Sequence, residues 1–269
     1  MERRKFLTST LAASALAAGP PTSVLRGAED SAGQSGREYY ELRQYHFESG
    51  SQAKLTHAFL RDALIPALGR LGVGPVGVFN IHIGPEGSRV FVLLPCRSLE
   101  TLANVDAQLW KDSVYLQAGN VFLTAAASAP AYVRMESKLM IAFEGRPKLA
   151  VPPATAERRP RTFELRTYES PSDRDHKRKV EMFHHGEFDI FRQAGFWPVF
   201  YGNTLVGTRL PNLTYMLAFD SLAERDKLWA TFGSNPQWKK LSSSPRYAFE
   251  GIVSNVDNLI LSPAPYSQI

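Results

Sequence analysis

The chain has 269 residues, of which 44% are hydrophobic and 21% are charged, with a formal net charge of +5. This composition is that of a globular protein with a sizeable core, and the length allows one large domain or two modest ones. Four of the 31 basic residues lie within residues 1–26, and the remaining chain is nearly balanced in charge, without a basic stripe. The sequence therefore argues against nucleic acid as a partner.

The first residues, MERRKFLTSTLAASALAAGPP, combine a basic start, a short apolar run and small side chains. The stretch RRKFL (3–7) is typical of a twin-arginine export signal, and ALA (15–17) offers a cleavage site. An ordinary secretory signal or a membrane-tethered leader is the alternative. We expect residues 1–37 to be an export signal with a flexible lead-in. The mature protein would then be periplasmic or attached to the cell envelope, with no stable membrane span.

Two similar stretches, YELRQY at 40–45 and FELRTY at 163–168, lie 123 residues apart, and further residues match at the same offset. A period this long indicates a duplicated domain rather than a solenoid. The segment between the copies is rich in proline and charge, as linkers are. We therefore predict domains at 38–145 and 162–269, joined by a linker at 146–161.

Each copy shows the same order of predicted elements, from period-2 strands and amphipathic helical stripes. In chain order they are strand, helix, strand, strand, helix and strand. In the first copy they lie at 39–47, 52–70, 76–83, 89–95, from 98 onward, and 134–143. In the second copy they lie at 162–169, 174–194, 199–206, 213–219, from 221 onward, and 252–261. This β-α-β-β-α-β order is that of a ferredoxin-like domain, whose sheet has helices on one face only. We predict an α+β fold in which two tandem ferredoxin-like domains pack sheet to sheet as an intramolecular dimeric α/β barrel.

The first copy is longer than the second between its second helix and its last strand. The extra residues accompany an apolar stretch, which we expect to be a loop at 119–132. Such a loop would cover a barrel mouth or serve as an interface, and a packed surface loop is the alternative.

The two ELR stretches, SLAERDKLW (221–229) and SNPQWKKL (234–241) resemble the NIPSNAP family, in particular its exported, tandem-domain bacterial branch. The resemblance covers nearly all of residues 38–269, although the first copy has KDSVY (111–115) in place of the NPQW motif. It implies a dimeric α/β-barrel fold and no settled activity. Relatives at the superfamily level include cofactor-free monooxygenases, small-molecule isomerases and haem proteins, but a shared fold does not determine function.

Polar side chains alternate along the first strand of each copy. They are Glu41, Arg43, Tyr45, Glu164, Arg166 and Tyr168. Since Leu42 and Leu165 suit the helix side, we expect this set to face the barrel interior and to line a pocket for an acidic or hydroxylated molecule. The alternative is a structural ion-pair network that seals the barrel. Asn80 and Asn203 recur on the second strands and are further ligand-binding candidates, with a bulge or turn role as the alternative.

Glu187 lies on the buried helical stripe of the second copy, where the first copy has Leu64. A partly buried carboxylate is a candidate acid or base, so Glu187 and Tyr168 are the catalytic candidates, and pairing of Glu187 with Arg166 is the alternative. His184 lies three residues before Glu187, a spacing that suits two metal ligands, but a solvated helix face explains it as well. We predict no metal site.

His46 and His82 lie on predicted strands of the first copy and are further candidates for haem or metal ligands, with a hydrogen-bonded or exposed histidine as the alternative. We predict no cofactor. The chain has no G-x-S-x-G, P-loop, G-x-G-x-x-G or H-E-x-x-H motif, which lowers hydrolase, nucleotide-binding and metalloprotease interpretations. Two functions stay open. In the first, the chain binds or converts a small organic molecule in a polar barrel pocket. In the second, it is a non-enzymatic interaction or structural module of the cell envelope. Further homo-oligomerisation is also left open.

Overall fold

The structure is a computed structural model that describes residues 36–84 and 88–269. The expected export signal and most of its lead-in lie outside the described residues. In the described part of the chain, no helix combines the length and the apolar character needed to cross a bilayer.

The first copy has four strands, with helical segments after its first and third strands. Its elements are β1 (Tyr39–His46), α1 (Gly50–Phe59), α2 (Ile65–Arg70), β2 (Gly77–Ile83), β3 (Arg89–Cys96), α3 (Leu99–Leu109), α4 (Ser113–Leu123) and β4 (Arg134–Ala142). A π-helical turn, Leu60–Leu64, joins α1 to α2. Ser49 and Ser98 begin the two helical segments, because their side chains accept hydrogen bonds from backbone N–H groups three residues on.

The second copy repeats this order after a short helix in the linker. Its elements are α5 (Pro153–Ala156), β5 (Thr162–Glu169), α6 (Asp173–Met182), α7 (Phe188–Ala194), β6 (Trp197–Val206), β7 (Asn212–Phe219), α8 (Leu222–Ser234), α9 (Pro236–Ser242), α10 (Phe249–Ile252) and β8 (Asn255–Pro263). A π-helical turn, Phe183–Glu187, again interrupts the first helix. Gly195 ends α7 with a φ of 91°, a left-handed conformation that glycine adopts without strain.

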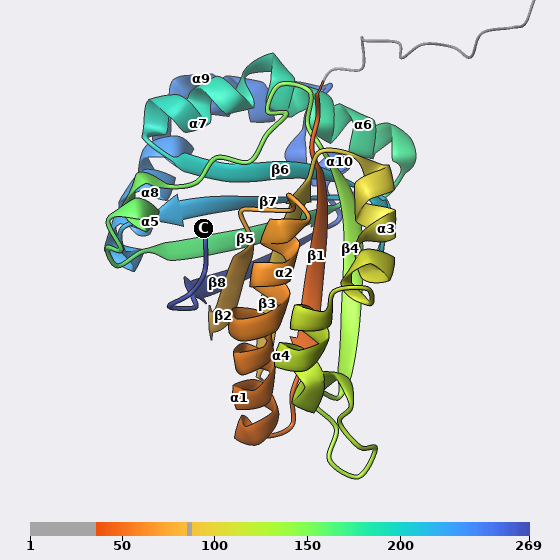
Figure 1. The fold of residues 1–269 in the computed structure, drawn as a ribbon. Helices are drawn as coiled ribbons and strands as arrows, with labels where there is room; N and C mark the ends of the chain where they lie inside the picture. Colours follow the sequence, from red (N-terminus) through yellow and green to blue (C-terminus); the bar gives the residue numbers. More distant parts are fainter. Residues whose placement is uncertain (1–35, 85–87) are drawn as a thin grey trace, which may run out of the picture. The chain divides into compact units, whose positions relative to one another are not determined.

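The two sheets join into one closed barrel. Each copy forms an antiparallel sheet, in the orders β4-β1-β3-β2 and β8-β5-β7-β6. The edge strands then pair between the copies, β2 with β8 and β4 with β6, so the described barrel has no open edge. The predicted α+β fold, an intramolecular dimeric α/β barrel of two ferredoxin-like units, is confirmed (Figure 1).

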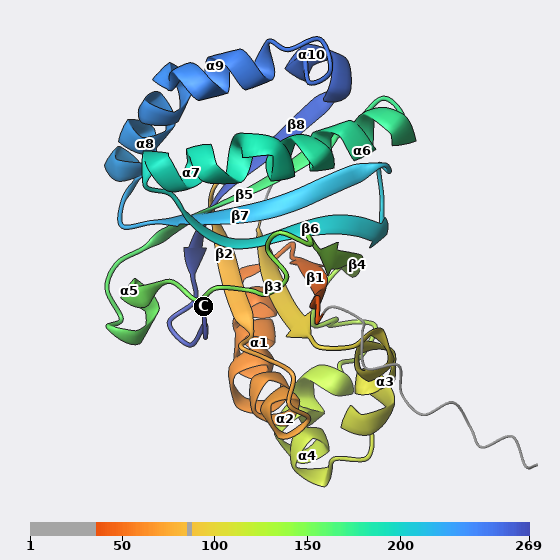
Figure 2. The same cartoon turned by 90° about the horizontal axis from the view of Figure 1, so that it is seen from above.

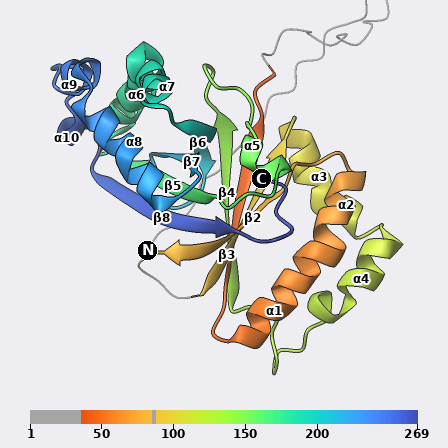
Figure 3. The ribbon, with the colours of Figure 1, turned by 90° about the vertical axis from the view of Figure 1, so that its left-hand side faces the viewer.

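The helices lie outside the barrel. Helices α1 to α4 cover the first sheet and α6 to α9 cover the second, as two further views show (Figures 2 and 3). Two apolar cores lie between a sheet and its helices, and a third fills the barrel interior. The large side chains of the interior core include Tyr40, Leu42, Phe79, Phe91, Phe163, Leu165 and Phe200. Alternate residues of β3 and β7 therefore serve different cores.

The second helix of each copy is split in two. Asp112 begins α4 by accepting hydrogen bonds from the backbone N–H groups of the next turn, and Asn235 begins α9 in the same way. The stretch 119–132 is therefore helical as far as Leu123 rather than a loop throughout. Within it, the Phe122 ring stacks on the Phe59 ring with centroids 3.9 Å apart, which fixes this stretch in the helix layer of the first copy.

Candidate functional site

The strand face that carries the ELR stretches lies under the helices, so the expectation that it faces the barrel interior is wrong. Leu42 and Leu165 belong to the interior core, whereas Tyr45 and Tyr168 pack in the two helix-side cores. Side-chain alternation puts the charged members on the helix side too: Glu41, Arg43, Glu164 and Arg166. Both faces of these strands are covered: the helices cover the charged face, and the more apolar face lines the barrel interior.

Glu164 is the centre of a buried ion-pair network in the second copy. Its carboxylate accepts hydrogen bonds from Arg166 at 2.8 Å, from Arg225 at 2.8 Å through two nitrogens, and from the Trp229 indole at 2.7 Å. Burial opposes ionisation of Glu164, but these donors outweigh it and hold the pKa of the carboxyl below its usual range. Four charge-assisted bonds leave this carboxylate well satisfied as a structural group.

The first copy has a simpler version of the same network. Glu41 accepts hydrogen bonds from Arg43 at 2.7 and 2.8 Å and from Ser137 at 2.7 Å. Tyr45 packs against Phe122 with the ring centroids 6.3 Å apart. These contacts fit the structural alternative, and the ligand-binding roles of the ELR residues stay predictions.

Glu187 pairs with Lys179 rather than with Arg166. Lys179 Nζ donates to Glu187 Oε2 at 2.6 Å, and the two side chains are only 0% and 2% exposed. Burial raises the pKa of Glu187 and lowers the pKa of Lys179, because desolvation disfavours both charges. Tyr168 lies 2.8 Å from the Tyr215 hydroxyl, and burial raises its pKa. The catalytic roles of Glu187 and Tyr168 stay predictions.

Asn80 and Asn203 each contact a histidine of the covering helix. The Asn80 side-chain oxygen lies 3.0 Å from His57 Nε2, and that of Asn203 lies 2.5 Å from His176 Nε2. The recurrence of asparagine thus corresponds to a helix-to-sheet contact in both copies. Within residues 36–84 and 88–269, no group of three or more His, Cys, Asp or Glu side chains is placed to hold a metal ion.

A partly enclosed cavity of about 240 Å³, the barrel-mouth cavity, lies between the two sheets at one end of the barrel. Its apolar floor consists of Leu42, Phe91, Leu165 and Leu259. Its polar wall includes Gln44, Arg89, Lys138, Thr167, Arg209 and Asp257. Strands of both copies supply these side chains, so barrel closure itself creates the site. Neither Glu187 nor Tyr168 lines it.

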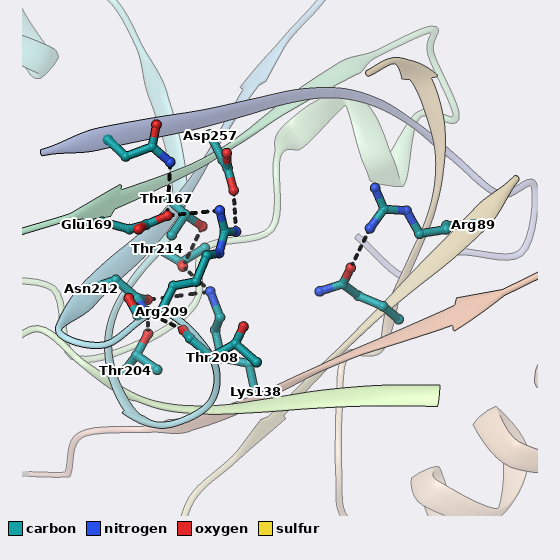
Figure 4. Close-up of polar contacts among 12 residues, drawn as sticks. Arg89, Lys138, Thr167, Glu169, Thr204, Thr208, Arg209, Asn212, Thr214 and Asp257 are labelled. Carbon is teal, nitrogen blue, oxygen red and sulfur yellow. Dashed lines mark hydrogen bonds and ion pairs between the residues drawn. The ribbon is translucent and has the colours of Figure 1, made fainter. Parts of the chain in front are cut away.

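Lys138 reaches from the first copy to the second inside this cavity (Figure 4). It lies on β4 opposite Leu42 of β1, and only 9% of the residue is exposed. Its Nζ donates to Thr214 Oγ1 at 3.1 Å and lies 3.5 Å from Asn212 Oδ1, both on β7. The Thr214 hydroxyl is 2.9 Å from that of Thr167, which lines the cavity. A chain of hydroxyls therefore links the amine to the cavity wall.

Arg209 is placed by the turn between β6 and β7. Its φ is 57°, and the Asn212 side-chain amide holds the turn by donating to the carbonyl oxygens of Thr208 and Arg209 at 2.9 and 2.8 Å. The guanidinium contacts Glu169 at 2.8 Å and also Asp257 (Figure 4). Arg209 and Asp257 thus bring one positive and one negative charge to the cavity wall.

The opposite wall of the cavity carries a second polar pair. Arg89 donates to Gln44 Oε1 at 3.2 Å, and Figure 4 shows Arg89 across the barrel from Lys138. The space between them is bounded below by apolar side chains. This combination of an apolar floor and a few convergent polar groups is typical of small-molecule sites.

The amine of Lys138 has an altered pKa. Burial, together with the nearby Arg209 charge, lowers the pKa of Lys138 from its usual 10.5 to about 8, despite opposing effects of Asp257 and Glu169. Near neutral pH the group is thus mainly ammonium, with a minor fraction of free amine. As an ammonium it can donate to a carboxylate or carbonyl oxygen, and as an amine it can act as a base or nucleophile.

The sequence did not reveal this site because the strand face expected in the barrel interior is the face under the helices. The residues that line the cavity stand next to the expected ones: Gln44 follows Arg43, and Thr167 follows Arg166. One indication was available. Lys138 alternates with Met140 and Ala142 on a strand whose other interior residues are apolar, and such a lysine calls for a specific explanation.

The closed barrel of two ferredoxin-like repeats, with a polar cavity where the repeats meet, places the protein in the class of dimeric α/β-barrel proteins. The family model NIPSNAP matches residues 40–144 and 163–268, one match for each repeat. The chain therefore belongs to the NIPSNAP family. No curated protein matches the chain.

Two solved structures with TM-scores above 0.5 support the fold. A candidate monooxygenase of Fusobacterium nucleatum is similar over 85% of this chain and 93% of its own, with 9% identity and a TM-score of 0.54. A second, from Lactobacillus acidophilus, is similar over 84% and 94%, with 9% identity and a TM-score of 0.51. A NIPSNAP family protein of unknown function from Agrobacterium tumefaciens matches 39% of this chain and 89% of its own, with 20% identity and a TM-score of 0.35. At such identities the likeness concerns the fold alone.

Proposed function

We propose that the protein binds a small polar organic molecule in the barrel-mouth cavity, with Lys138 as the principal polar contact. The main observation in support is the environment of Lys138. The residue lines the cavity and is nearly buried, yet both hydrogen-bond partners of its Nζ, Thr214 and Asn212, are neutral. A buried cation without an anionic partner is costly, and an anionic or carbonyl oxygen of a ligand would offset that cost.

The size and lining of the cavity restrict the ligand. Its volume of about 240 Å³ lies below that of sites for drug-sized molecules, which span roughly 300–1,000 Å³. The apolar floor suits a short carbon skeleton, and the wall offers hydrogen bonds from Thr167, Gln44 and Arg209. A small carboxylic, hydroxylated or carbonyl compound fits this combination.

Native mass spectrometry of the purified full chain, followed by titration calorimetry, tests the proposal. We expect a co-purified small mass, or binding from a panel of short carboxylates, hydroxy acids and carbonyl compounds. Lys138→Met should weaken binding at least about tenfold, because one charge-assisted hydrogen bond contributes roughly 1.5–3 kcal/mol. Lys54→Met changes an exposed lysine on α1 and should leave binding unchanged. Equal affinity of both variants would contradict the proposal.

A second candidate function is protein–protein interaction, favoured by exposed apolar side chains on α3, α4 and the turn between them. Trp110, Val114 and Val121 are 55%, 60% and 70% exposed. Scattered apolar side chains are normal on a surface, so this observation is weaker than the cavity. A Val114→Ser/Val121→Ser variant separates the two functions. It should keep small-molecule binding if the cavity is the functional site, and lose a partner if the α4 surface is.

We also propose that the chain is exported, on the basis of the sequence of residues 1–37. Fractionation of cells that carry the wild-type chain and an Arg3→Lys/Arg4→Lys variant tests it. We expect the wild type in the periplasm or envelope and the variant retained in the cytoplasm as a precursor. Equal distribution of the two chains would contradict twin-arginine export.

A further inference from the structure

The amine of Lys138 has no counterpart in the second copy. In the first copy Leu42 of β1 lies opposite Lys138 of β4, and in the second copy Leu165 of β5 lies opposite Leu259 of β8. Of the two equivalent positions in the barrel, Lys138 thus carries an amine and Leu259 does not. A packing role alone would be met by leucine at both positions, as the second copy shows. The asymmetry indicates a chemical role for the amine.

The charged groups around Lys138 leave its own charge poorly compensated. Arg209 projects from the β6–β7 turn, Glu169 from β5 and Asp257 from β8, and the Arg209 guanidinium contacts both carboxylates. Arg89 lines the far wall on β3. In the described part of the chain no ion pair joins Lys138 to a carboxylate, and its Nζ contacts only Thr214 and Asn212. The protonated amine is therefore less stabilised than a surface lysine, and the free amine is accessible near neutral pH.

We propose that Lys138 Nζ is a nucleophile that condenses with the carbonyl carbon of a small aldehyde or ketone held in the barrel-mouth cavity. The inference rests on the proposed function of that cavity and identifies its substrate class. The Nζ lone pair forms the new C–N bond, and the carbonyl oxygen takes up one proton from the nitrogen and one from solvent and leaves as water. The product is an iminium on Lys138, and no oxidant or reductant is consumed.

The hydroxyl chain beside Lys138 suits the proton movements of this step. Thr214 Oγ1 lies 3.1 Å from Nζ and 2.9 Å from Thr167 Oγ1, and Thr167 lines the cavity. Attack on the carbonyl takes a proton from nitrogen, and loss of water delivers a proton to oxygen. Thr214 and Thr167 can pass a proton between these two atoms, so Thr214 is a positioning residue for the amine. The apolar floor below limits the water that would hydrolyse the iminium.

Reductive trapping on the full chain tests the inference. The protein is incubated with glyoxylate and sodium cyanoborohydride, which converts an iminium irreversibly into a carboxymethyl amine, and the modified lysines are located by peptide mass spectrometry. A pKa of about 8 leaves far more free amine at neutral pH than the usual lysine value of 10.5. We therefore expect Lys138 to be modified at least about tenfold faster than the exposed Lys54, with the rate rising and levelling off near pH 8.

Two variants and one binding measurement make the outcome decisive. Lys138→Arg keeps the positive charge and should show no adduct at this position, while Thr214→Val should slow trapping and shift its pH profile. Modification of Lys138 no faster than of Lys54 would overturn the inference. Acetate, which has the carboxylate but no reactive carbonyl, is titrated in parallel. If acetate binds in a Lys138-dependent manner without glyoxylate trapping, the iminium inference fails and the proposed binding function stands; if neither is seen, both fail.

Discussion

Replacement of Lys138 by methionine should stabilise the protein at neutral pH, because the lysine is held where its charge is disfavoured. Lys138→Met keeps an unbranched side chain of similar length and removes the ammonium. Its neighbours on the cavity floor, Leu42 and Leu165, are apolar and receive a methionine side chain readily. The variant thus separates the cost of the charge from the packing of the side chain.

The magnitude follows from the pKa of Lys138. A fall in the pKa from 10.5 to about 8 corresponds to about 3 kcal/mol of stability lost at neutral pH, at ~1.4 kcal/mol for each tenfold change in proton affinity. Methionine also loses the hydrogen bond to Thr214, worth about 1 kcal/mol. The variant should therefore be more stable than the wild type by about 2 kcal/mol near neutral pH.

The pH dependence has a definite sign. The folded-state pKa of Lys138 lies below the unfolded-state value, so between about 8 and 10.5 the unfolded chain binds more protons. Wild-type stability must rise with pH across this window relative to the variant, which has no such group. The advantage of Lys138→Met is fully present below about pH 8 and should vanish, or reverse by about 1 kcal/mol, near pH 10.5.

Urea unfolding, followed by the fluorescence of the four tryptophans, measures this difference at a series of pH values. Comparison of the two chains at each pH cancels the titrations that they share. The matched control Lys54→Met removes an exposed lysine and should show a difference that is small and independent of pH. A pH-independent difference for Lys138→Met, or a variant that is less stable than the wild type at neutral pH, would refute the argument.

Three further variants test the buried ion pairs and the β4–β6 strand pair between the two copies by chemical denaturation. Glu187→Leu should lower the free energy of unfolding by about 3–5 kcal/mol, because it leaves Lys179 buried and unpaired. Adding Lys179→Met should restore most of that loss. Equal losses in the single and double variants would argue against a stabilising pair. Glu164→Gln should lose about 2–4 kcal/mol. This loss should shrink as the pH falls through the depressed pKa of Glu164, and a constant loss would show that its charge is unimportant. Gly202→Ala should lower the free energy of unfolding by about 1–3 kcal/mol, because a Cβ at this position would lie 2.9 Å from Met140 on the paired strand β4. A variant as stable as the wild type would indicate looser packing between β4 and β6.

The fold was predictable because the duplication constrains it twice. Each copy carries the same order of strands and helices, and the bare sheet face of one copy has the other copy as its nearest cover. The breaks in the second helices were partly readable, since Asn235 followed by Pro236 is a common helix start. The π-helical turns at Leu60–Leu64 and Phe183–Glu187 depend on tertiary packing and leave no clear local pattern.

The candidate site was less predictable, for a specific physical reason. Alternation separates the two faces of a strand but does not say which face is inside when helices cover the other. Glu164 and Arg166 suggest a polar interior, yet α8 supplies Arg225 and Trp229 to satisfy them outside the barrel. The partner of Lys138 lies 76 residues away in sequence, at Thr214, and only barrel closure brings the two together.

The most direct test of the barrel-mouth site is to locate where a small ligand binds. Threonine-methyl NMR spectra of the full chain, recorded during titration with glyoxylate or acetate, report on Thr167 and Thr214 at the cavity and on distant threonines such as Thr101 at the start of α3. We expect saturable shifts at Thr167 and Thr214 that disappear in Lys138→Met, with Thr101 unchanged. Shifts confined to the helix surfaces would contradict a functional site at the barrel mouth, and shifts at Thr167 and Thr214 that survive in Lys138→Met would contradict Lys138 as its principal polar contact.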